Sequence, residues 1–173
     1  ADRHRFGLIL GFPIQDNVVL TAYHREPFAH GILRDDKAIA REAAEEIAAF
    51  DVRTPSATVP AATLSGGNQQ KVVVAREFDR DLRLLLVDQP TRGLDVGSIE
   101  FIHRQIIAKR DAGTAVLLVS AELDEVLEMS DRIAVMYRGA LVAFRDGRTA
   151  DKNEIGLLMA TGGRAEAAEG VPA

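Results

Sequence analysis

The stretch that decides the fold lies between residues 64 and 95: residues 64–71 read LSGGNQQK and residues 84–95 read LLLVDQPTRGLD. In the first segment, two adjacent glycines follow a serine at the predicted start of a helix, where backbone amides and the helix dipole attract an anion. In the second, an apolar strand ends at Asp88, where open α/β sheets place ligand chemistry. A serine that caps a helix and an aspartate that caps a turn are the simpler alternatives for each segment alone.

The residues around these two segments have the periodicities of an α/β protein. Apolar residues at helical spacing predict helices over 35–50, 65–78, 99–110 and 122–129, the first capped by Asp35 or Asp36. Apolar runs predict strands over 82–87, 115–119 and 132–136, with a hairpin turn at Gly139 into 141–144. Because the run over 82–87 is continuous, it predicts a strand buried on both faces of a parallel sheet. Strands that alternate with helices over short links indicate right-handed crossovers.

The two ends of the chain are less regular. Residues 7–10 are expected to form a short strand or loop, followed by a short helix over 18–23 that Asp16 or Asn17 caps. Residues 51–63 contain two prolines and several Ser and Thr residues, which predicts an extended connector. A last helix is expected over 151–160, and the small, polar residues beyond Gly162 are expected to be disordered.

The composition excludes several classes of protein. A formal net charge of −5 over 173 residues argues against general nucleic-acid binding, which requires a basic surface. The absence of cysteine excludes disulfides and thiolate metal sites. No apolar stretch approaches the roughly 20 residues that cross a bilayer, and Gly11 and Pro13 interrupt the apolar start too early for a signal peptide. Any role at a membrane is therefore expected to be peripheral.

Taken together, LSGGNQQK, LLLVD and GLD at 93–95 resemble the signature motif, Walker B strand and D-loop of an ABC ATPase nucleotide-binding domain. GNQQK with PTRGLDVG is similar to the second cassette of sugar and nucleoside importers, and GFPIQDNVVLTAYHREPF with FIHRQIIAKRDAGTAVLLVSAELDEV favours the nucleoside branch. The resemblance implies an α/β fold with a partial RecA-like P-loop NTPase sheet core and a small helical subdomain. It also implies three regions: a helical-subdomain region over 1–64, the signature, Walker B, D-loop and switch region over 65–147, and a C-terminal helix with a disordered tail over 148–173.

The same resemblance implies ATP and Mg²⁺ as cofactors, with Asp88 as the metal-binding residue. In the family, two cassettes pair head to tail, and the signature of one contacts the ATP that the Walker A motif of the other holds. The signature of this chain would therefore serve the ATP of its partner. The residues implied in nucleotide binding belong to the signature and the D-loop: Ser65, Gly66, Gly67, Asn68, Gln69 and Asp95.

Three features depart from the family pattern. No GxxxxGK[ST] occurs, so the P-loop is missing, and the chain is expected to be a fragment or truncated product without ATPase activity in isolation. Gln89 stands where a catalytic glutamate is expected, and an amide cannot accept a proton as a general base. Ala121 stands where the switch histidine is expected. The resemblance therefore implies a degenerate half-site at Asp88, Gln89 and Ala121, beside an intact signature.

Other conspicuous side chains have simpler explanations. Phe12, Ile14 and Phe28 fall where the helical subdomain of this family docks membrane subunits, yet packing in the core explains them more simply. None of the four histidines replaces the switch histidine, because they fall in predicted N-terminal loops or within a predicted helix: His4, His24, His30 and His103.

These features predict an energy-coupling subunit of an ABC importer for nucleosides or sugars at the cytoplasmic face of the membrane. Its partners would be a second nucleotide-binding cassette, transmembrane permease subunits and, indirectly, a solute-binding protein, with no nucleic acid. Two alternatives stay open: a soluble ABC ATPase without a role in transport, and a non-catalytic fragment with an interaction role. The transported solute does not follow from these residues, because the permease and its binding protein determine selectivity.

Overall fold

The computed structural model describes residues 7–78 and 82–163. The chain divides into two compact units, Ala1–Leu117 and Leu118–Ala173, which are described separately. The boundary between these two units does not test the three functional regions expected from the sequence. Those regions stay a prediction. Among the described residues, no helix combines the length and the apolar character that crossing a membrane requires.

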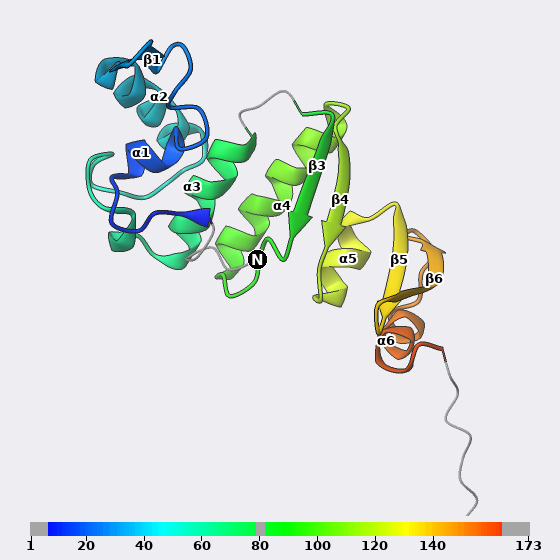
Figure 1. Ribbon diagram of the computed structural model, residues 1–173. Helices are drawn as coiled ribbons and strands as arrows, with labels where there is room; N and C mark the ends of the chain where they lie inside the picture. Colours follow the sequence, from blue (N-terminus) through cyan, green and yellow to red (C-terminus); the bar gives the residue numbers. More distant parts are fainter. Residues whose placement is uncertain (1–6, 79–81, 164–173) are drawn as a thin grey trace, which may run out of the picture. The chain divides into compact units, whose positions relative to one another are not determined.

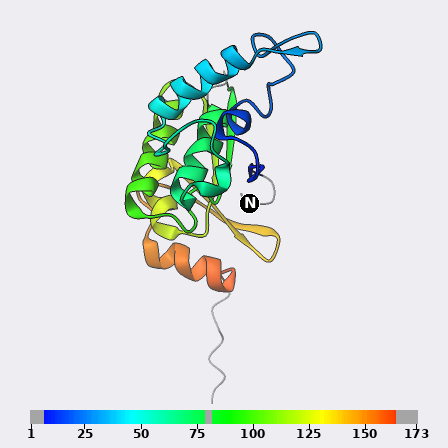
Figure 2. The same cartoon turned by 90° about the vertical axis from the view of Figure 1, so that its left-hand side faces the viewer.

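The first unit holds a group of helices followed by a strand–helix–strand segment (Figure 1). A small hairpin, formed by β1 and β2, projects beyond the start of α2 (Figure 2). The elements in chain order, up to the strand in which the first unit ends, are α1 (Ile14–Val18), β1 (Ala29–His30), β2 (Leu33–Arg34), α2 (Asp36–Ala49), the 3₁₀ turn η2 (Ala61–Thr63), α3 (Gly66–Phe78), β3 (Leu84–Asp88), α4 (Val96–Asp111) and β4 (Ala115–Val119).

The predicted capping of α2 is confirmed, and the predicted start of α1 is wrong. Asp35 accepts hydrogen bonds from the amides of Lys37 and Ala38, both at 3.0 Å, and the helix begins directly after it. The first helix covers Ile14–Val18 instead of residues 18–23. Asn17 lies inside it and is fully buried, because its side chain pairs with the backbone amide and carbonyl of Ile9 at 2.8 and 3.0 Å. That partner is eight residues away, which a local capping pattern does not reveal.

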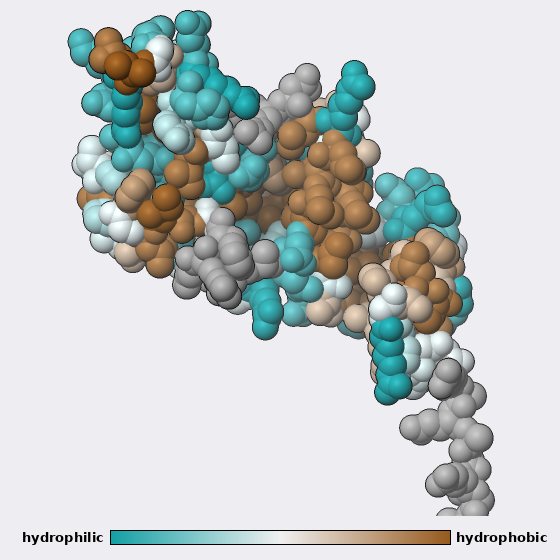
Figure 3. All heavy atoms as spheres, in the orientation of Figure 1, coloured by the Kyte–Doolittle hydropathy of each residue, from teal (hydrophilic) through white to brown (hydrophobic). Residues whose placement is uncertain are grey.

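The strand–helix–strand prediction is confirmed, but β3 is not buried on both faces. β3 and β4 form a two-stranded sheet, and α4 joins them. Leu85 is 6% exposed, whereas Leu84 and Leu86 on the opposite face are 61% and 65% exposed. Figure 3 shows hydrophobic side chains gathered over β3 and β4. One face of β3 is therefore covered and the other is open within the described part of the chain.

The second unit contains α5 (Leu123–Met129), β5 (Arg132–Tyr137), β6 (Ala140–Asp146) and α6 (Lys152–Thr161). β5 and β6 pair antiparallel through a two-residue turn, in which Arg138 and Gly139 both have positive φ, as a tight hairpin requires. The hairpin and α6 enclose a small core of Ile133, Val135 and Ile155. The predicted strand, hairpin and last helix are thereby confirmed, whereas the predicted disordered tail lies outside the described residues.

Candidate functional site

The residues that we call the signature turn, Ser65, Gly66 and Gly67, lie at the start of α3. Ser65 Oγ accepts hydrogen bonds from the amide and the side-chain Nδ2 of Asn68, at 3.4 and 3.0 Å. Both contacts use the oxygen as an acceptor, so neither occupies the hydroxyl proton. The amides of Gly66 and Gly67 belong to the first turn of a helix and have no intrahelical acceptor. Ser65 thus caps the helix, and the turn still offers donors to an anion.

Asn68 and Gln69, which the sequence assigns to the nucleotide, make contacts within the chain. Asn68 Oδ1 accepts from the amide of Arg53 at 2.8 Å. Gln69 is 6% exposed, and its Nε2 donates to the carbonyls of Ala61 and Leu64 at 3.3 and 3.2 Å. Both side chains therefore hold the connector that leads into the signature turn.

Asp95, the last residue of the D-loop segment, caps α4. Its Oδ1 accepts from the amide of Ser98 at 3.0 Å, and its Oδ2 accepts from the hydroxyl of Ser98 at 2.8 Å. The Ser98 hydroxyl, followed by its amide, holds the pKa of the Asp95 carboxyl below its ordinary value. Gly67 lies against this cap, since a Cβ added to it would stand 3.0 Å from Asp95 Oδ2. The structure therefore brings the signature turn and the D-loop together.

Lys71 has a role in this region that the sequence analysis did not identify. Its Nζ donates to the carbonyl oxygen and Oδ2 of Asp51, at 2.8 and 2.9 Å, and lies 4.6 Å from the centre of the Phe101 ring. Lys71 lowers the pKa of the Asp51 carboxyl. Its spacing of four residues from Gly67 was the available signal, because it places both residues on one face of the helix.

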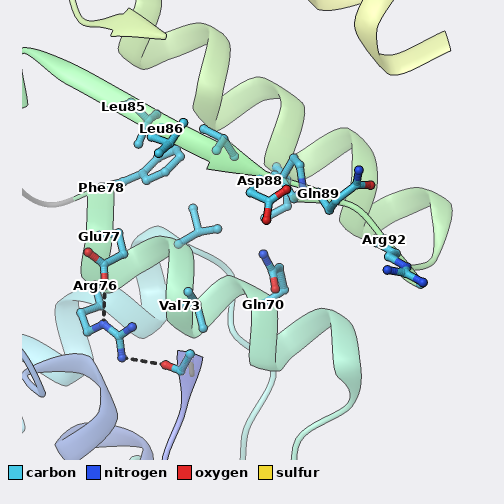
Figure 4. A pocket seen from close by; sticks show the side chains of 16 residues that line it. Gln70, Val73, Arg76, Glu77, Phe78, Leu85, Leu86, Asp88, Gln89 and Arg92 are labelled. Atoms are coloured by element: carbon cyan, nitrogen blue, oxygen red, sulfur yellow. Dashed lines mark hydrogen bonds and ion pairs between the residues drawn. The ribbon is translucent and has the colours of Figure 1, made fainter. Parts of the chain in front are cut away.

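Asp88 and Gln89 stand at the end of β3, beside a cavity of about 760 Å³ that Figure 4 shows from close by. Asp88 is exposed, and Gln89 has a φ of 49°, in the left-handed region that a glutamine rarely adopts. Gln70 of the signature helix lines the same cavity. The lining residues come from α3, α4, β3, the turn after β3 and the start of the described chain: Gly7, Gln70, Val73, Val74, Arg76, Glu77, Phe78, Leu85, Leu86, Val87, Asp88, Gln89, Pro90, Arg92, Gly93 and Ile102.

The residues around Asp88 fit only a cation that takes few of its ligands from the protein. Within residues 7–78 and 82–163, no three His, Cys, Asp or Glu side chains gather as a metal site. Mg²⁺ in phosphate-processing proteins needs only one or two carboxylates, since water and phosphate supply its other ligands. A single exposed carboxylate at the end of a strand is therefore compatible with Mg²⁺.

The remaining predicted positions lie further from the signature turn along the chain. Ala121 is exposed and belongs to the second compact unit, two residues after β4. Of the three apolar candidates for docking, Ile14 and Phe28 are buried, and Phe12 is 47% exposed. His4 lies outside the described residues, and His30 belongs to β1 instead of the predicted loop.

Curated proteins and solved structures that resemble this chain include ATP-binding proteins and cassettes of ABC transporters. No family model matches the chain. The chain is 48% identical over 167 residues to the guanosine import ATP-binding protein of Bacillus subtilis, a match that covers 96% of this chain and 32% of that protein. It is also 48% identical over 161 residues to the nucleoside import ATP-binding protein of Lactococcus lactis, covering 93% and 32%. With the glucose import ATP-binding protein of Haloferax volcanii it shares 40% over 171 residues, covering 98% and 31%.

Solved structures show the same fold. A dimeric ATP-binding cassette in a post-hydrolysis state with ADP and phosphate superposes with a TM-score of 0.69 at 24% identity, covering 84% of this chain and 61% of that chain. The fold is thus that of an ABC ATPase cassette, and the predicted fold class is confirmed. Over almost its whole length the chain is similar to part of the ATP-binding proteins of ABC importers. It spans about a third of the length of the curated relatives described above.

Proposed function

We propose that the chain is the signature-bearing part of an ATP-binding subunit that couples ATP hydrolysis to the import of nucleosides or sugars. The observation that carries the proposal is the signature turn, with two glycine amides and a serine hydroxyl at the start of α3. The relatives support the substrate class, because those with 48% identity are named for guanosine and nucleoside import.

The signature turn would bind and orient a terminal phosphate of the ATP that a partner cassette holds. Backbone amides and the positive end of the helix dipole favour an anion there, and the Ser65 hydroxyl adds a donor. Asn68 and Gln69 would act on the nucleotide through the connector that they hold in place. Asp95 would contribute at the same end of the α3–α4 pair, where it lies near Gly67.

The half-site that belongs to this chain would be degenerate. Asp88 would hold Mg²⁺, which supplies charge neutralisation to phosphate oxygens when it is bound. Gln89 can orient a water molecule but cannot take its proton, and Ala121 offers no hydrogen bond to a phosphate. The chain would therefore serve a catalytically complete partner at the opposite site. Its other partners would be permease subunits at the cytoplasmic face of the membrane, with Phe12 as a contact of the helical region.

A hybrid importer tests this function. In the hybrid, the present chain replaces the matching region of the Bacillus subtilis guanosine import ATP-binding protein. We expect ATP-dependent guanosine uptake to persist, to be lost on Ser65→Ala with Gly66→Asp, and to be unchanged on Gly11→Ala, where an added Cβ meets nothing within 4 Å. A hybrid that reaches the membrane with its permease and transports nothing would contradict the proposal.

The degenerate half-site is tested by restoring the two expected groups in the same hybrid. Gln89→Glu together with Ala121→His should raise the rate of ATP turnover, because the first supplies a general base and the second a phosphate contact. An unchanged rate after both substitutions would contradict the proposed degenerate half-site.

A further inference from the structure

The signature helix α3 and the helix α4 pack against each other in a fixed register. Gly67 lies opposite Ser98, and Lys71, one turn later on α3, lies opposite Phe101, one turn later on α4. The two helices therefore run in the same direction, as Figure 1 shows. Their starts, which carry the signature turn and the D-loop, are neighbours.

At the first of these two contacts, Gly67 and Ser98 leave no room for a side chain. A Cβ added to Gly67 would stand 2.3 Å from Ser98 Oγ and 3.2 Å from Ser98 Cβ. Real Cβ atoms do not approach other atoms at 2.3 Å, so either the Ser98 hydroxyl would have to rotate away from Asp95 Oδ2 or the two helices would have to move apart. The absence of a side chain at Gly67, which is buried, thus serves the close packing of the two helices.

Ser98 is not free to move away from Gly67. Its side chain is buried, at 8% exposure, and Asp95 holds both its amide and its hydroxyl. These two hydrogen bonds also cap α4, so the position of the Ser98 hydroxyl is tied to the first turn of that helix. The second contact adds support, since Lys71 links α3 to Phe101 and to Asp51.

We propose that Ser98, held by Asp95, is a positioning residue for the signature turn, because its hydroxyl packs directly against Gly67. The effect on nucleotide binding rests on the proposed function. In that function, the position of Gly67 sets the direction of the backbone amides that would contact a phosphate. A displacement of the D-loop would be transmitted to the signature turn through this contact. Asp95 would then act on the nucleotide through Ser98 and Gly67.

The first test measures the position of the turn in the 173-residue chain itself, without nucleotide. The Gln69 amide, which donates to the Ser65 carbonyl at 2.9 Å, reports whether the turn is held. Ser98→Ala should speed hydrogen exchange at the amides of residues 69–72 about fivefold, the effect of losing one hydrogen bond. Gly67→Ala should speed it more, and the double variant with Ser98→Ala should exchange more slowly than Gly67→Ala alone, because the colliding oxygen is gone.

Two control variants separate positioning from a general loss of stability. Ser56→Ala removes an exposed hydroxyl of the connector, and Asp151→Ala removes the cap of α6 in the second unit. Neither should change exchange at residues 69–72. The proposal is overturned if Ser98→Ala leaves these amides unchanged or speeds all amides of the first unit equally, or if the double variant shows no rescue.

The second test uses the hybrid importer. Ser98→Ala should lower kcat for ATP hydrolysis about fivefold and change KM by less than about twofold, because the partner's Walker A motif would set ATP affinity. If Ser98→Ala and Ser56→Ala lowered kcat equally, the role of Ser98 in ATP turnover would be overturned. If the unmodified hybrid hydrolyses no ATP, the proposed function fails, whereas the exchange measurement still decides whether Ser98 positions the turn.

Discussion

Replacing Gln69 separates its role inside the chain from a direct role at the nucleotide. Its side-chain amide donates to the carbonyls of Ala61 and Leu64, and all three residues are buried. Gln69→Leu removes these two hydrogen bonds, each worth about 1 kcal/mol net. The Leu64 carbonyl loses this donor, and the Ala61 carbonyl keeps the amide of Leu64 as a donor. We expect the free energy of unfolding of the first unit to fall by about 2 kcal/mol.

Gln69→Glu is the sharper variant, because a carboxylate cannot donate to those carbonyls. At neutral pH the ionised group would face two oxygen acceptors in a buried site, which costs more than the loss in the leucine variant. Burial and the nearby oxygens would raise the pKa of the new carboxyl in the folded state. A protonated glutamic acid can donate to a carbonyl, whereas a carboxylate cannot. The stability of this variant should therefore be retained below the pKa that the new carboxyl would have in the unfolded chain, and it should be lost as the pH rises from that value through the higher pKa of the folded state.

Urea unfolding of the 173-residue chain, followed by far-ultraviolet circular dichroism at pH 7 and pH 5, measures both variants. With a slope of about 2 kcal/mol per molar urea, Gln69→Leu should lower the urea midpoint for unfolding of the first unit by about 1 M. Gln70→Leu and Gln70→Glu are matched controls, since Gln70 lines the open cavity instead (Figure 4). Equal midpoints for the Gln69 and Gln70 variants, or a Gln69→Glu variant that is no more stable at pH 5 than at pH 7, would refute this role.

Three further predictions concern packing, pH and nucleotide affinity. Gly147→Ala should destabilise the second unit by about 3 kcal/mol or more, because the added Cβ would lie 1.7 Å from the Ser130 carbonyl oxygen, while Gly11→Ala should be near neutral; thermal unfolding compares them. The cap that Asp95 forms on α4 should be intact above the ordinary pKa of an aspartate, 3.8, and should be lost as the pH falls through the lower pKa of the folded state. Hydrogen exchange at the start of α4, measured over an acid titration, should show this loss in the parent chain but not in Asp95→Asn. Equilibrium binding of labelled ATP to the isolated chain should be weaker than about 1 µM, because the sequence contains no P-loop, and a submicromolar affinity would contradict that reasoning.

Signals that act over a few residues were readable from the sequence. Asp35 caps α2, and Gly162 ends α6 in the left-handed conformation, because both depend only on the backbone next to them. The signature helix begins at Gly66, as the serine and the two glycines predict. The same local logic found the strand that ends at Asp88.

Features that depend on distant partners were not readable in this way. Asn17 has the pattern of a helix cap, yet its side chain bonds the backbone of Ile9. Gln69 sits in a nucleotide motif, but its side-chain amide is buried against the connector. The apolar run of β3 predicts burial on both faces, whereas Leu84 and Leu86 are exposed, since burial depends on which elements lie over each face. The link from Gly67 to Ser98 crosses 31 residues and carries no local signature.

The central claim is that the signature turn contacts a phosphate of ATP that a partner cassette holds. Hydrogen exchange at residues 65–69 of the hybrid importer, with and without a non-hydrolysable ATP analogue, tests it most directly. We predict that saturating analogue slows exchange at Gly66 and Gly67, whose amides lack acceptors within the helix, and that Ser65→Ala with Gly66→Asp abolishes the effect. Unchanged exchange at these amides, while the hybrid binds the analogue to saturation, would contradict the account.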